Sequence, residues 1–482
     1  MLENELIDLV EEICEQKTEK QNVELKTAHD GCPRKLYDTL SSFSNQDSGG
    51  IIIFGIEENN GYSLKGVYDL QDLQKKVTEQ CNQMEPKVRA VFTSARIDGK
   101  NICSAEIPSV EISQRPCYYT GLGIIKGSYI RVGDADLPMT DYEVYSYEAF
   151  RKHVHDDERK VEKASLNMLD KNNVEKYVLD KKIGRPGFAK LEENQMLEML
   201  NITREGKPTL AAVMNFGIYP QGYFPQLAIT AIVVPGKEIG EIDSDNARFL
   251  DNKRIEGTIA DMTDEALNFC KRNMKIKTVI NPKTGKREDR TEYPIEAVRE
   301  AVLNALIHRD YSEYTEGTPI QMNYFSDRLE IHSPGGLYGR MRLEQLGEAK
   351  ADLRNPALAV IAETMTNAEN RYSGIPTMRR LMKEYELPAP VFENRRQEFI
   401  VTFYNSTKEN ETEDNSQNLS DTERILEFCK TPRTRKEIAD FLKIKTVSYA
   451  ISENIRPLVK KGLIGLTIPE SPRSRNQKYY TV

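Results

Sequence analysis

Two glutamates and a lysine stand close together near the start of the chain. Glu24 and Lys26 are two residues apart in EKQNVELK, so on a β-strand their side chains share one face, and Glu19 lies just upstream. Carboxylates grouped with a lysine can hold a divalent metal ion and orient an attacking water, as metal-assisted phosphodiester hydrolysis requires. The same spacing also allows a purely structural salt bridge between Glu24 and Lys26.

A second polar pair lies on an otherwise apolar helix. The pattern PIEAVREAVLNALIHRD predicts a helix over residues 294–308, with Pro294 at a favoured first-turn position. Glu300 and Asn304 are four residues apart, so they share one face of that helix. Most of the remaining positions are apolar, and the pair therefore predicts a polar site on a buried helix.

The C-terminal tail has the spacing of a helix-turn-helix. Thr434 and Glu437 form a capping box that opens TRKEIADFLK, and after the turn KIK a further helix is predicted in TVSYAISENIRPLVKKG. GLIGLTI and KYYTV then predict two strands joined by the basic loop PESPRSRNQ. From Asp421 onward there are 13 Lys and Arg against 7 Asp and Glu, a net charge of +6 that leaves −14 on the preceding residues. A basic tail on an acidic body indicates a polyanion contact in the tail.

This tail resembles the winged helix family of bacterial regulators. In such a module the third helix enters the major groove of duplex DNA and the wing touches the backbone. The resemblance implies groove-facing side chains on the third helix and phosphate contacts on the wing. The former are Thr446, Ser448, Tyr449, Ser452 and Arg456, and the latter are Arg473, Arg475 and Lys478. A winged helix used for protein docking is the alternative.

The elements that must position these sites predict an α/β multidomain (α+β) protein. At 482 residues the chain is long enough for two to four domains. Buried strands are predicted in GIIIFGI, QLAITAIVVPG and RQEFIVTFY, and the polar stretch 405–420 is predicted to be a flexible linker. The expected organisation is a first domain over 1–150, a middle α/β segment over 151–290, a third domain over 291–404, the linker, and the winged helix over 421–482.

Composition excludes several classes of protein. Hydrophobic residues make up 39% and charged residues 29%, and no apolar run approaches the length of a membrane helix, so a cytoplasmic protein without a membrane partner is expected. The seven cysteines never occur as CxxC, which favours free thiols over disulfides or structural zinc. No G-x-x-x-x-G-K-S/T sequence occurs, and a translocating P-loop helicase motor is therefore rejected.

The first 150 residues resemble the Schlafen-type AlbA_2 domain. The matches are Glu19, Glu24 and Lys26, then Phe43, Asn45, Gly49 and Gly50, then Gly55, and YIRVG at 129–133 continues them. The resemblance places Glu58 at the third acidic position, where the family has Asp, and the loop reads NQDSGG instead of the family's Asn-Thr loop. It implies metal binding by Glu19, Glu24 and Glu58, with Lys26 beside them, in an endoribonuclease acting on RNA such as tRNA. Nucleic-acid binding without cleavage stays open as the alternative within the family.

The segment before the linker resembles the bacterial HATPase_c_4 family of GHKL-like ATPase domains. REAVLNALIHRDY, DRLEIHSPGGL, LRNPALA and ENRYSGIPTMRRLM occur in the order seen in that family, which often follows an AlbA_2 domain. The resemblance implies an ATP site in which Asn304 binds Mg²⁺ and Glu300 positions water. It also implies glycine-rich contacts to the phosphates from Gly335, Gly336, Ser373 and Gly374. Ser333 stands where active relatives in the wider superfamily have an adenine-binding Asp, and a structural or dimerising role is the alternative.

The leading hypothesis is a DNA-binding transcriptional regulator whose winged helix binds double-stranded DNA and whose body binds ATP and forms a homodimer. The alternative is a Schlafen-like, metal-dependent endoribonuclease with RNA bound by the N-terminal domain. A non-enzymatic interaction scaffold is the third possibility. Enzymatic activity, as an ATPase or a nuclease, is left open by the sequence.

Overall fold

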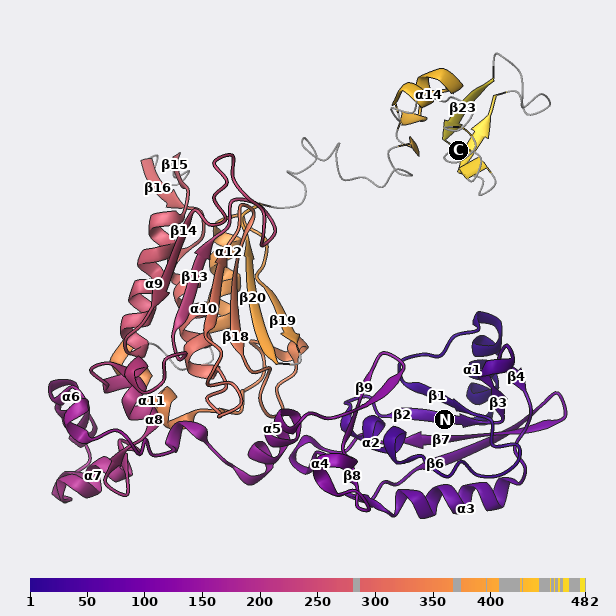
Figure 1. Cartoon of the computed structure of the whole chain (residues 1–482), viewed down its shortest axis with the longest axis horizontal. Coiled ribbons are helices and arrows are strands. Elements are labelled where there is room, and N and C mark those ends of the chain that lie inside the picture. Colours follow the sequence, from indigo (N-terminus) through magenta and orange to yellow (C-terminus); the bar gives the residue numbers. More distant parts are fainter. Residues whose placement is uncertain are drawn as a thin grey trace. The chain divides into compact units, whose positions relative to one another are not determined.

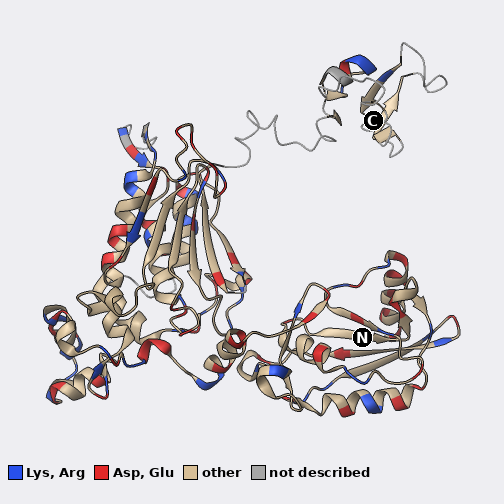
Figure 2. Cartoon of the chain, in the orientation of Figure 1, with Lys and Arg blue, Asp and Glu red and all other residues tan. Residues whose placement is uncertain are grey.

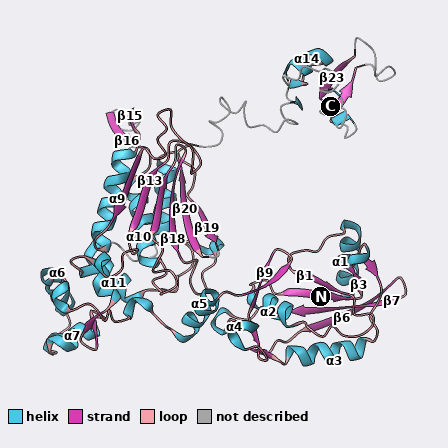
Figure 3. Ribbon diagram, in the orientation of Figure 1, coloured by secondary structure: helices cyan, strands magenta, loops and turns pink. Residues whose placement is uncertain are grey.

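The structure is a computed structural model of the chain. It describes residues 1–280, 287–366, 374–395, 397–406, 425–426, 428–441, 451, 455, 458–459, 463–467 and 477–481. The chain divides into two compact units, Met1–Tyr404 and Asn405–Val482 (Figure 1). Both helices and strands build the larger unit (Figure 3), which confirms the predicted mixed α/β, multidomain class.

A four-stranded sheet forms the centre of the N-terminal part, in the order β1-β2-β7-β6. Strand β1 runs parallel to β2, and the other pairs are antiparallel. Its strands are β1 (Val23–Lys26), β2 (Gly50–Phe54), β6 (Val91–Ile97) and β7 (Lys100–Ile107). The run GIIIF in β2 is apolar throughout because both faces of this strand are covered. Ile53 packs in one cluster with α1 (Glu3–Gln16), while Ile52 and Phe54 pack with α2 (Tyr37–Asn45) and α3 (Leu70–Cys81).

Short elements around this sheet complete the N-terminal domain. They are β3 (Ile56–Glu57), β4 (Ser63–Leu64), β5 (Met84–Glu85), β8 (Tyr118–Tyr119), α4 (Gly123–Gly127), β9 (Tyr129–Val132) and β10 (Ala135–Pro138). The hairpin β9-β10 places Arg131 opposite Asp136. Helix α5 (Asp141–Lys152) follows at once and begins at a capping box between Thr140 and Glu143.

The rest of the larger unit is built on a six-stranded sheet in the order β14-β13-β17-β18-β20-β19. Its strands are β13 (Ile229–Val233), β14 (Asp251–Ile255), β17 (Ile320–Tyr324), β18 (Arg328–Pro334), β19 (Val391–Arg395) and β20 (Glu398–Tyr404). Strand β13 pairs in parallel with β17, and the other pairs are antiparallel. The middle segment predicted over 151–290 therefore shares a sheet with the segment predicted over 291–404.

Helices cover one face of this sheet and close a single apolar core with it (Figure 1). The covering helices are α9 (Ile259–Asn273), α10 (Ile295–His308) and α12 (Gly374–Glu384), and α8 (Leu210–Phe216) and α11 (Pro356–Thr366) extend the core at one end. The smaller elements are α6 (Lys171–Lys182), α7 (Glu193–Met199), the pair β11 (Thr203–Arg204) and β12 (Lys207–Pro208), and the hairpin β15 (Ile276–Ile280) and β16 (Arg287–Thr291). Helix α10 begins directly after Pro294, as its sequence predicts.

The second unit has its own small core. Its described elements are β21 (Arg433–Thr434), α14 (Arg435–Phe441), β22 (Ile464–Leu466) and β23 (Lys478–Thr481), and the strands form a sheet in the order β21-β23-β22. The capping box is present: the Thr434 backbone N–H donates to Glu437 at 2.8 Å, and the Glu437 backbone N–H donates to Oγ1 of Thr434 at 3.3 Å. Within the residues that the structure describes, no helix has the length and apolar character needed to cross a membrane.

Candidate functional site

Two cations neutralise the Glu24 carboxylate on β1. Nζ of Lys26 lies 2.5 Å from Oε1 of Glu24, as expected for side chains two residues apart on a strand. A guanidinium N–H of Arg131 donates to Oε2 of the same carboxylate at 2.9 Å. Both oxygens of Glu24 therefore already have charged partners.

Arg131 is the centre of this cluster, and sequence reasoning missed it as a site residue. Its side chain is only 1% exposed, and it donates to the carboxylate of Asp136 at 3.0 Å and to the Val23 carbonyl at 3.1 Å. The hydroxyls of Thr39 and Ser42 also donate to Asp136. The cluster, here called the Arg131 clamp, ties β1 to the β9-β10 hairpin through ion pairs and hydrogen bonds centred on the buried Arg131 guanidinium.

Glu19 and Glu58 lie beside the clamp. Oε1 of Glu19 accepts a hydrogen bond from the Leu25 backbone N–H at 3.0 Å, and Oε2 lies 4.0 Å from Arg131. Burial and the nearby Glu24 and Glu58 carboxylates raise the pKa of Glu19 to about 7. The predicted carboxylates are therefore close enough to repel one another.

A metal-ligand arrangement is not formed by these carboxylates. Among the described residues, no group of three or more His, Cys, Asp or Glu side chains has the geometry to hold a metal ion. The two cations on Glu24 also offset the negative charge that a divalent ion would need. The geometry fits an ion-paired surface better than a metal centre, and the metal and catalytic roles of Glu19, Glu24, Lys26 and Glu58 stay predictions.

The predicted helix pair lines a cavity of about 190 Å³ whose walls include residues of α10, β18, β20 and α12. Glu300 and Asn304 lie on α10, and most other lining side chains are apolar, among them Ile331, Met341 and Phe399. Among the residues that the structure describes, no hydrogen bond to the Asn304 side-chain amide is found. The position fits the predicted magnesium-binding role.

Gly374, the first residue of α12, lies directly against this pair. A Cβ atom at Gly374 would come within 2.9 Å of a Glu300 carboxylate oxygen and 3.1 Å of the Asn304 amide nitrogen. Only glycine lets the helix start approach these side chains so closely. The structure thus brings Glu300, Asn304 and Gly374 together, as the sequence predicts, while Ser373 lies outside the described residues.

The glycines after β18 serve packing. Gly335 has φ +91°, and a Cβ atom there would clash with the guanidinium of Arg354 at 2.2 Å. Its backbone N–H donates to the Gln397 carbonyl at 2.8 Å, and the Gly336 carbonyl accepts from Arg354 at 3.1 Å. The Gly335 N–H is therefore already used within the protein, so a phosphate would have to compete with the Gln397 carbonyl for it.

The adenine end of the predicted site also differs from the expected pattern. The hydroxyl of Ser333 donates to the Ala305 carbonyl at 3.1 Å and ties β18 to α10. His308, which faces the cavity, has a pKa lowered to about 4 by burial and by Arg354, so it is neutral at physiological pH. The residues present therefore fit magnesium and phosphate at Asn304 better than they fit adenine at Ser333.

A line of alternating charges crosses β18, β20 and β19 on the same sheet. His332 lies between two carboxylates, with Nε2 3.0 Å from Glu330 and Nδ1 3.1 Å from Glu398. Glu330 pairs with Arg328, and Glu398 pairs with Arg395. Burial alone would lower the pKa of His332, but hydrogen bonds to the two glutamates raise it.

Most of the predicted DNA-contacting residues lie outside the described residues. These are Thr446, Ser448, Tyr449, Ser452, Arg456, Arg473 and Arg475. Lys478 is described: it begins β23, its side chain is exposed, and its backbone N–H donates to Oγ1 of Thr467 at 3.0 Å. Its predicted phosphate contact stays a prediction.

Comparisons with known proteins identify the parts of the chain. Residues 19–140 match the family "Schlafen, AlbA_2". Residues 317–403 match HATPase_c_4, described as "Putative ATP-dependent DNA helicase recG C-terminal". Residues 421–481 match "Filamentation induced by cAMP protein Fic-like, C-terminal domain". The chain therefore contains a Schlafen-type AlbA_2 domain and a HATPase_c_4 domain, and both predicted resemblances are confirmed.

Two solved structures are similar to the chain. The DIP2311 protein from Corynebacterium diphtheriae is 18% identical, with 99% of this chain and 97% of that chain covered and a TM-score of 0.40. The N-terminal domain of a RecG-related protein from Nitrosomonas europaea is 22% identical, with 28% of this chain and 92% of that chain covered and a TM-score of 0.23. A comparison with curated proteins finds no match.

The domain matches indicate a nucleic-acid-related function, and the ATPase-like domain suggests ATP as a ligand. The winged helix, the magnesium ion, the DNA and RNA partners and the homodimer stay predictions.

Proposed function

We propose that the protein is a cytoplasmic, DNA-binding transcriptional regulator that holds nucleic acid without cutting it. In this proposal the C-terminal unit contacts double-stranded DNA, the AlbA_2 domain supplies a second nucleic-acid surface, and the HATPase_c_4 domain binds ATP with Mg²⁺ as an effector. The protein acts as a homodimer, so that two C-terminal units reach two half-sites.

The Arg131 clamp is the observation that carries the proposal. A hydrolytic centre needs carboxylates that are free to bind a metal ion, whereas both oxygens of Glu24 are bound by Lys26 and Arg131. A fixed, ion-paired cluster can hold a surface in shape for binding but supplies no activated water. Binding is therefore the role that this geometry supports best.

The distribution of charge along the chain indicates which part contacts the phosphates of nucleic acid. In the AlbA_2 domain, α1 carries mainly acidic side chains and α3 carries both signs (Figure 2), so neither helix offers a continuous basic surface. The segment from residue 421 onward has a net charge of +6. The tail is therefore the strongest candidate for phosphate contacts.

The nucleotide part of the proposal is supported by the position of the Asn304 amide in the cavity and by the close approach of Gly374. When bound, ATP would supply phosphates for a Mg²⁺ ion held by Asn304. Glu300 lies one helical turn away on the same face, where it can accept a proton from a water molecule. The glycine turn at 335–336 would shape the opposite wall of the cavity.

One observation favours the nuclease as a second candidate. Burial and the Glu24 and Glu58 carboxylates raise the pKa of the Glu19 carboxyl, and a divalent cation would relieve the repulsion between the carboxylates. Such an ion would have to displace Lys26 or Arg131 from Glu24. Metal-dependent cleavage of RNA would then be the activity, with Glu58 in the place of the family's Asp.

The DNA-binding proposal is tested by salt-dependent binding of the full chain to duplex DNA. Affinity should fall steeply with salt, and each lost phosphate contact should flatten the logarithmic slope by ~0.9. The double change Arg473→Glu and Arg475→Glu should weaken binding to all duplex sequences. If the double variant binds duplex DNA with wild-type affinity, the C-terminal tail is not the DNA-binding part of the protein.

A further inference from the structure

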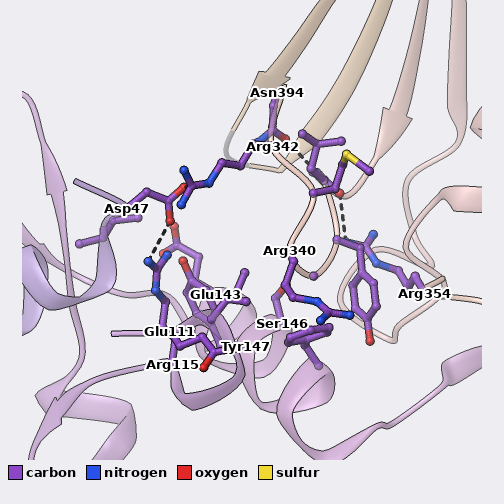
Figure 4. A pocket seen from close by; sticks show the side chains of 18 of the residues that line it. Asp47, Glu111, Arg115, Glu143, Ser146, Tyr147, Arg340, Arg342, Arg354 and Asn394 are labelled. Carbon is purple, nitrogen blue, oxygen red and sulfur yellow. Dashed lines mark hydrogen bonds and ion pairs between the residues drawn. The ribbon is translucent and has the colours of Figure 1, made fainter. Parts of the chain in front are cut away.

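A second cavity, of about 460 Å³, lies where the AlbA_2 domain meets the HATPase_c_4 domain (Figure 4). Its volume is within the range of cavities that hold small organic ligands. Five arginines and three carboxylates line it, and both domains contribute side chains. It is separate from the Asn304 cavity, although the loop after β18 forms a wall of both.

Two arginines from different domains converge on one carboxylate in this cavity. Asp47, in the loop NQDSGG before β2, accepts a hydrogen bond from Arg115 at 2.8 Å and lies 3.3 Å from Nε of Arg342. Arg115 is held in place because its side chain is only 7% exposed and also donates to the Val110 carbonyl. The two guanidinium groups thus form a preorganised anion site in which Asp47 is the anion at present.

The contact between Asp47 and Arg342 adds little to stability. The side chains of Asp47 and Arg342 are 50% and 56% exposed, and an exposed ion pair of this kind contributes little. A phosphate carries more charge than a carboxylate and has more acceptor oxygens, so it can engage both guanidinium groups more strongly. The exposed position also leaves the phosphate a route of entry.

Aromatic rings line the cavity near these arginines. Phe150 and Tyr338 pack edge to face with ring centroids 5.4 Å apart, and the guanidinium of Arg354 lies over the Tyr338 ring at 5.1 Å. Tyr147 adds a third ring beside Arg115 (Figure 4). Aromatic and arginine surfaces together are the usual means of binding a nucleobase by stacking while holding its phosphate.

We propose that this junction cavity binds a nucleoside phosphate, with the phosphate between Arg115 and Arg342 and the base against Tyr338 and Phe150. The ligand is a free nucleotide or the phosphorylated end of a single strand, which share this chemistry. Because its walls come from both domains, an occupied cavity would join the AlbA_2 domain to the loop that also lines the Asn304 cavity.

The test measures binding of AMP and of a short 5′-phosphorylated oligothymidylate to the full chain by isothermal titration calorimetry. Arg342→Gln should weaken binding by about fivefold or more, because it removes one of the two cations. Asp47→Asn should tighten binding by a similar factor, since the competing carboxylate is gone. Arg380→Gln is the matched control: Arg380 is 55% exposed, pairs with Glu384 on α12 and lies outside the cavity.

The opposite effects of Arg342→Gln and Asp47→Asn separate a ligand site from a structural contact. If Asp47 and Arg342 only hold the two domains together, both changes should act in the same direction or leave binding unchanged, and the proposal is overturned. It is also overturned if neither probe binds the wild type. Binding of AMP supports a nucleotide as the ligand, whereas binding of the oligonucleotide alone supports a strand end. Asn304→Ala should leave this binding intact, so loss of ATP binding at Asn304 would not affect the result.

Discussion

Replacement of Glu19 by Gln should stabilise the AlbA_2 domain at high pH. The glutamine keeps the carbonyl oxygen that accepts the hydrogen bond from Leu25, and it removes the charge that Glu24 and Glu58 repel. The pKa of Glu19 is raised from 4.5 to about 7, and the full shift corresponds to ~3 kcal/mol. Because Glu19 is partly solvated, we expect ~1–2 kcal/mol after screening.

The sign of the pH dependence follows from the raised pKa. Folding favours the protonated Glu19, so the wild type is most stable below the ordinary pKa and loses stability as pH rises through about 7. Glutamine does not titrate. The stability difference between Glu19→Gln and the wild type should therefore increase from pH 4.5 to pH 8 and then stay constant.

Differential scanning calorimetry of the full chain at pH 5 and pH 8 measures this difference. A gain of ~1–2 kcal/mol corresponds to a rise of roughly 3–8 °C in the melting temperature of a domain of this size. The AlbA_2 transition can be assigned as the one that Arg131→Met lowers. A difference that is the same at both pH values would refute the electrostatic reasoning. Stabilisation of the wild type by Mn²⁺ at pH 8, absent in Glu19→Gln, would favour the nuclease alternative.

Three further predictions concern other parts of the structure. Arg131→Met should destabilise the AlbA_2 domain by ~3–5 kcal/mol in calorimetry, because it leaves the carboxylate of Asp136 and one oxygen of Glu24 without their charged partner. Asn304→Ala should abolish the Mg²⁺-dependent part of the stabilisation by ATP, which is ~2.7 kcal/mol at 100 times the dissociation constant. If ATP with Mg²⁺ raises the melting temperature of Asn304→Ala as much as that of the wild type, Asn304 has a structural role and does not bind the ligand. His332→Gln should lower stability at pH 6 and have less effect at pH 9, because the raised pKa of His332 contributes stability that is lost as pH rises.

Local sequence patterns predicted the short-range geometry of this protein. The two-residue spacing of Glu24 and Lys26 predicted a shared face on a strand, and the two side chains form an ion pair. The four-residue spacing of Glu300 and Asn304 likewise predicted a shared helix face. The capping box at Thr434 could be found because its hydrogen bonds span only three residues.

Contacts between distant residues could not be found in this way. Arg131 and Glu24 are 107 positions apart, and the tertiary fold places the β9-β10 hairpin, which carries Arg131, within hydrogen-bond reach of β1. YIRVG offered one signal, a charged residue inside an apolar strand, which requires a buried partner. The ion pair between Asp47 and Arg342 was also missed, because the two residues are far apart in the sequence and lie in different domains. The sequence showed only that the loop carrying Asp47 departs from the family pattern.

A glycine in the sequence does not indicate which close approach it serves, because its absent side chain allows several. Gly335 and Gly336 were expected to bring backbone N–H groups to phosphates, but Gly335 makes room for Arg354 and donates its N–H to Gln397. Ser333 likewise bonds within the protein, since its hydroxyl donates to the Ala305 carbonyl. Whether such groups face a ligand or the protein depends on packing that the sequence pattern does not contain.

The most direct test of binding without cleavage is one incubation followed on two gels. The full chain is mixed with end-labelled duplex DNA and tRNA in the presence of Mg²⁺ or Mn²⁺, and a native gel reports binding while a denaturing gel reports cleavage. The account predicts a shifted complex and intact strands, with no difference between the wild type and Glu24→Gln on the denaturing gel. Metal-dependent cleavage by the wild type that Glu24→Gln removes would contradict it.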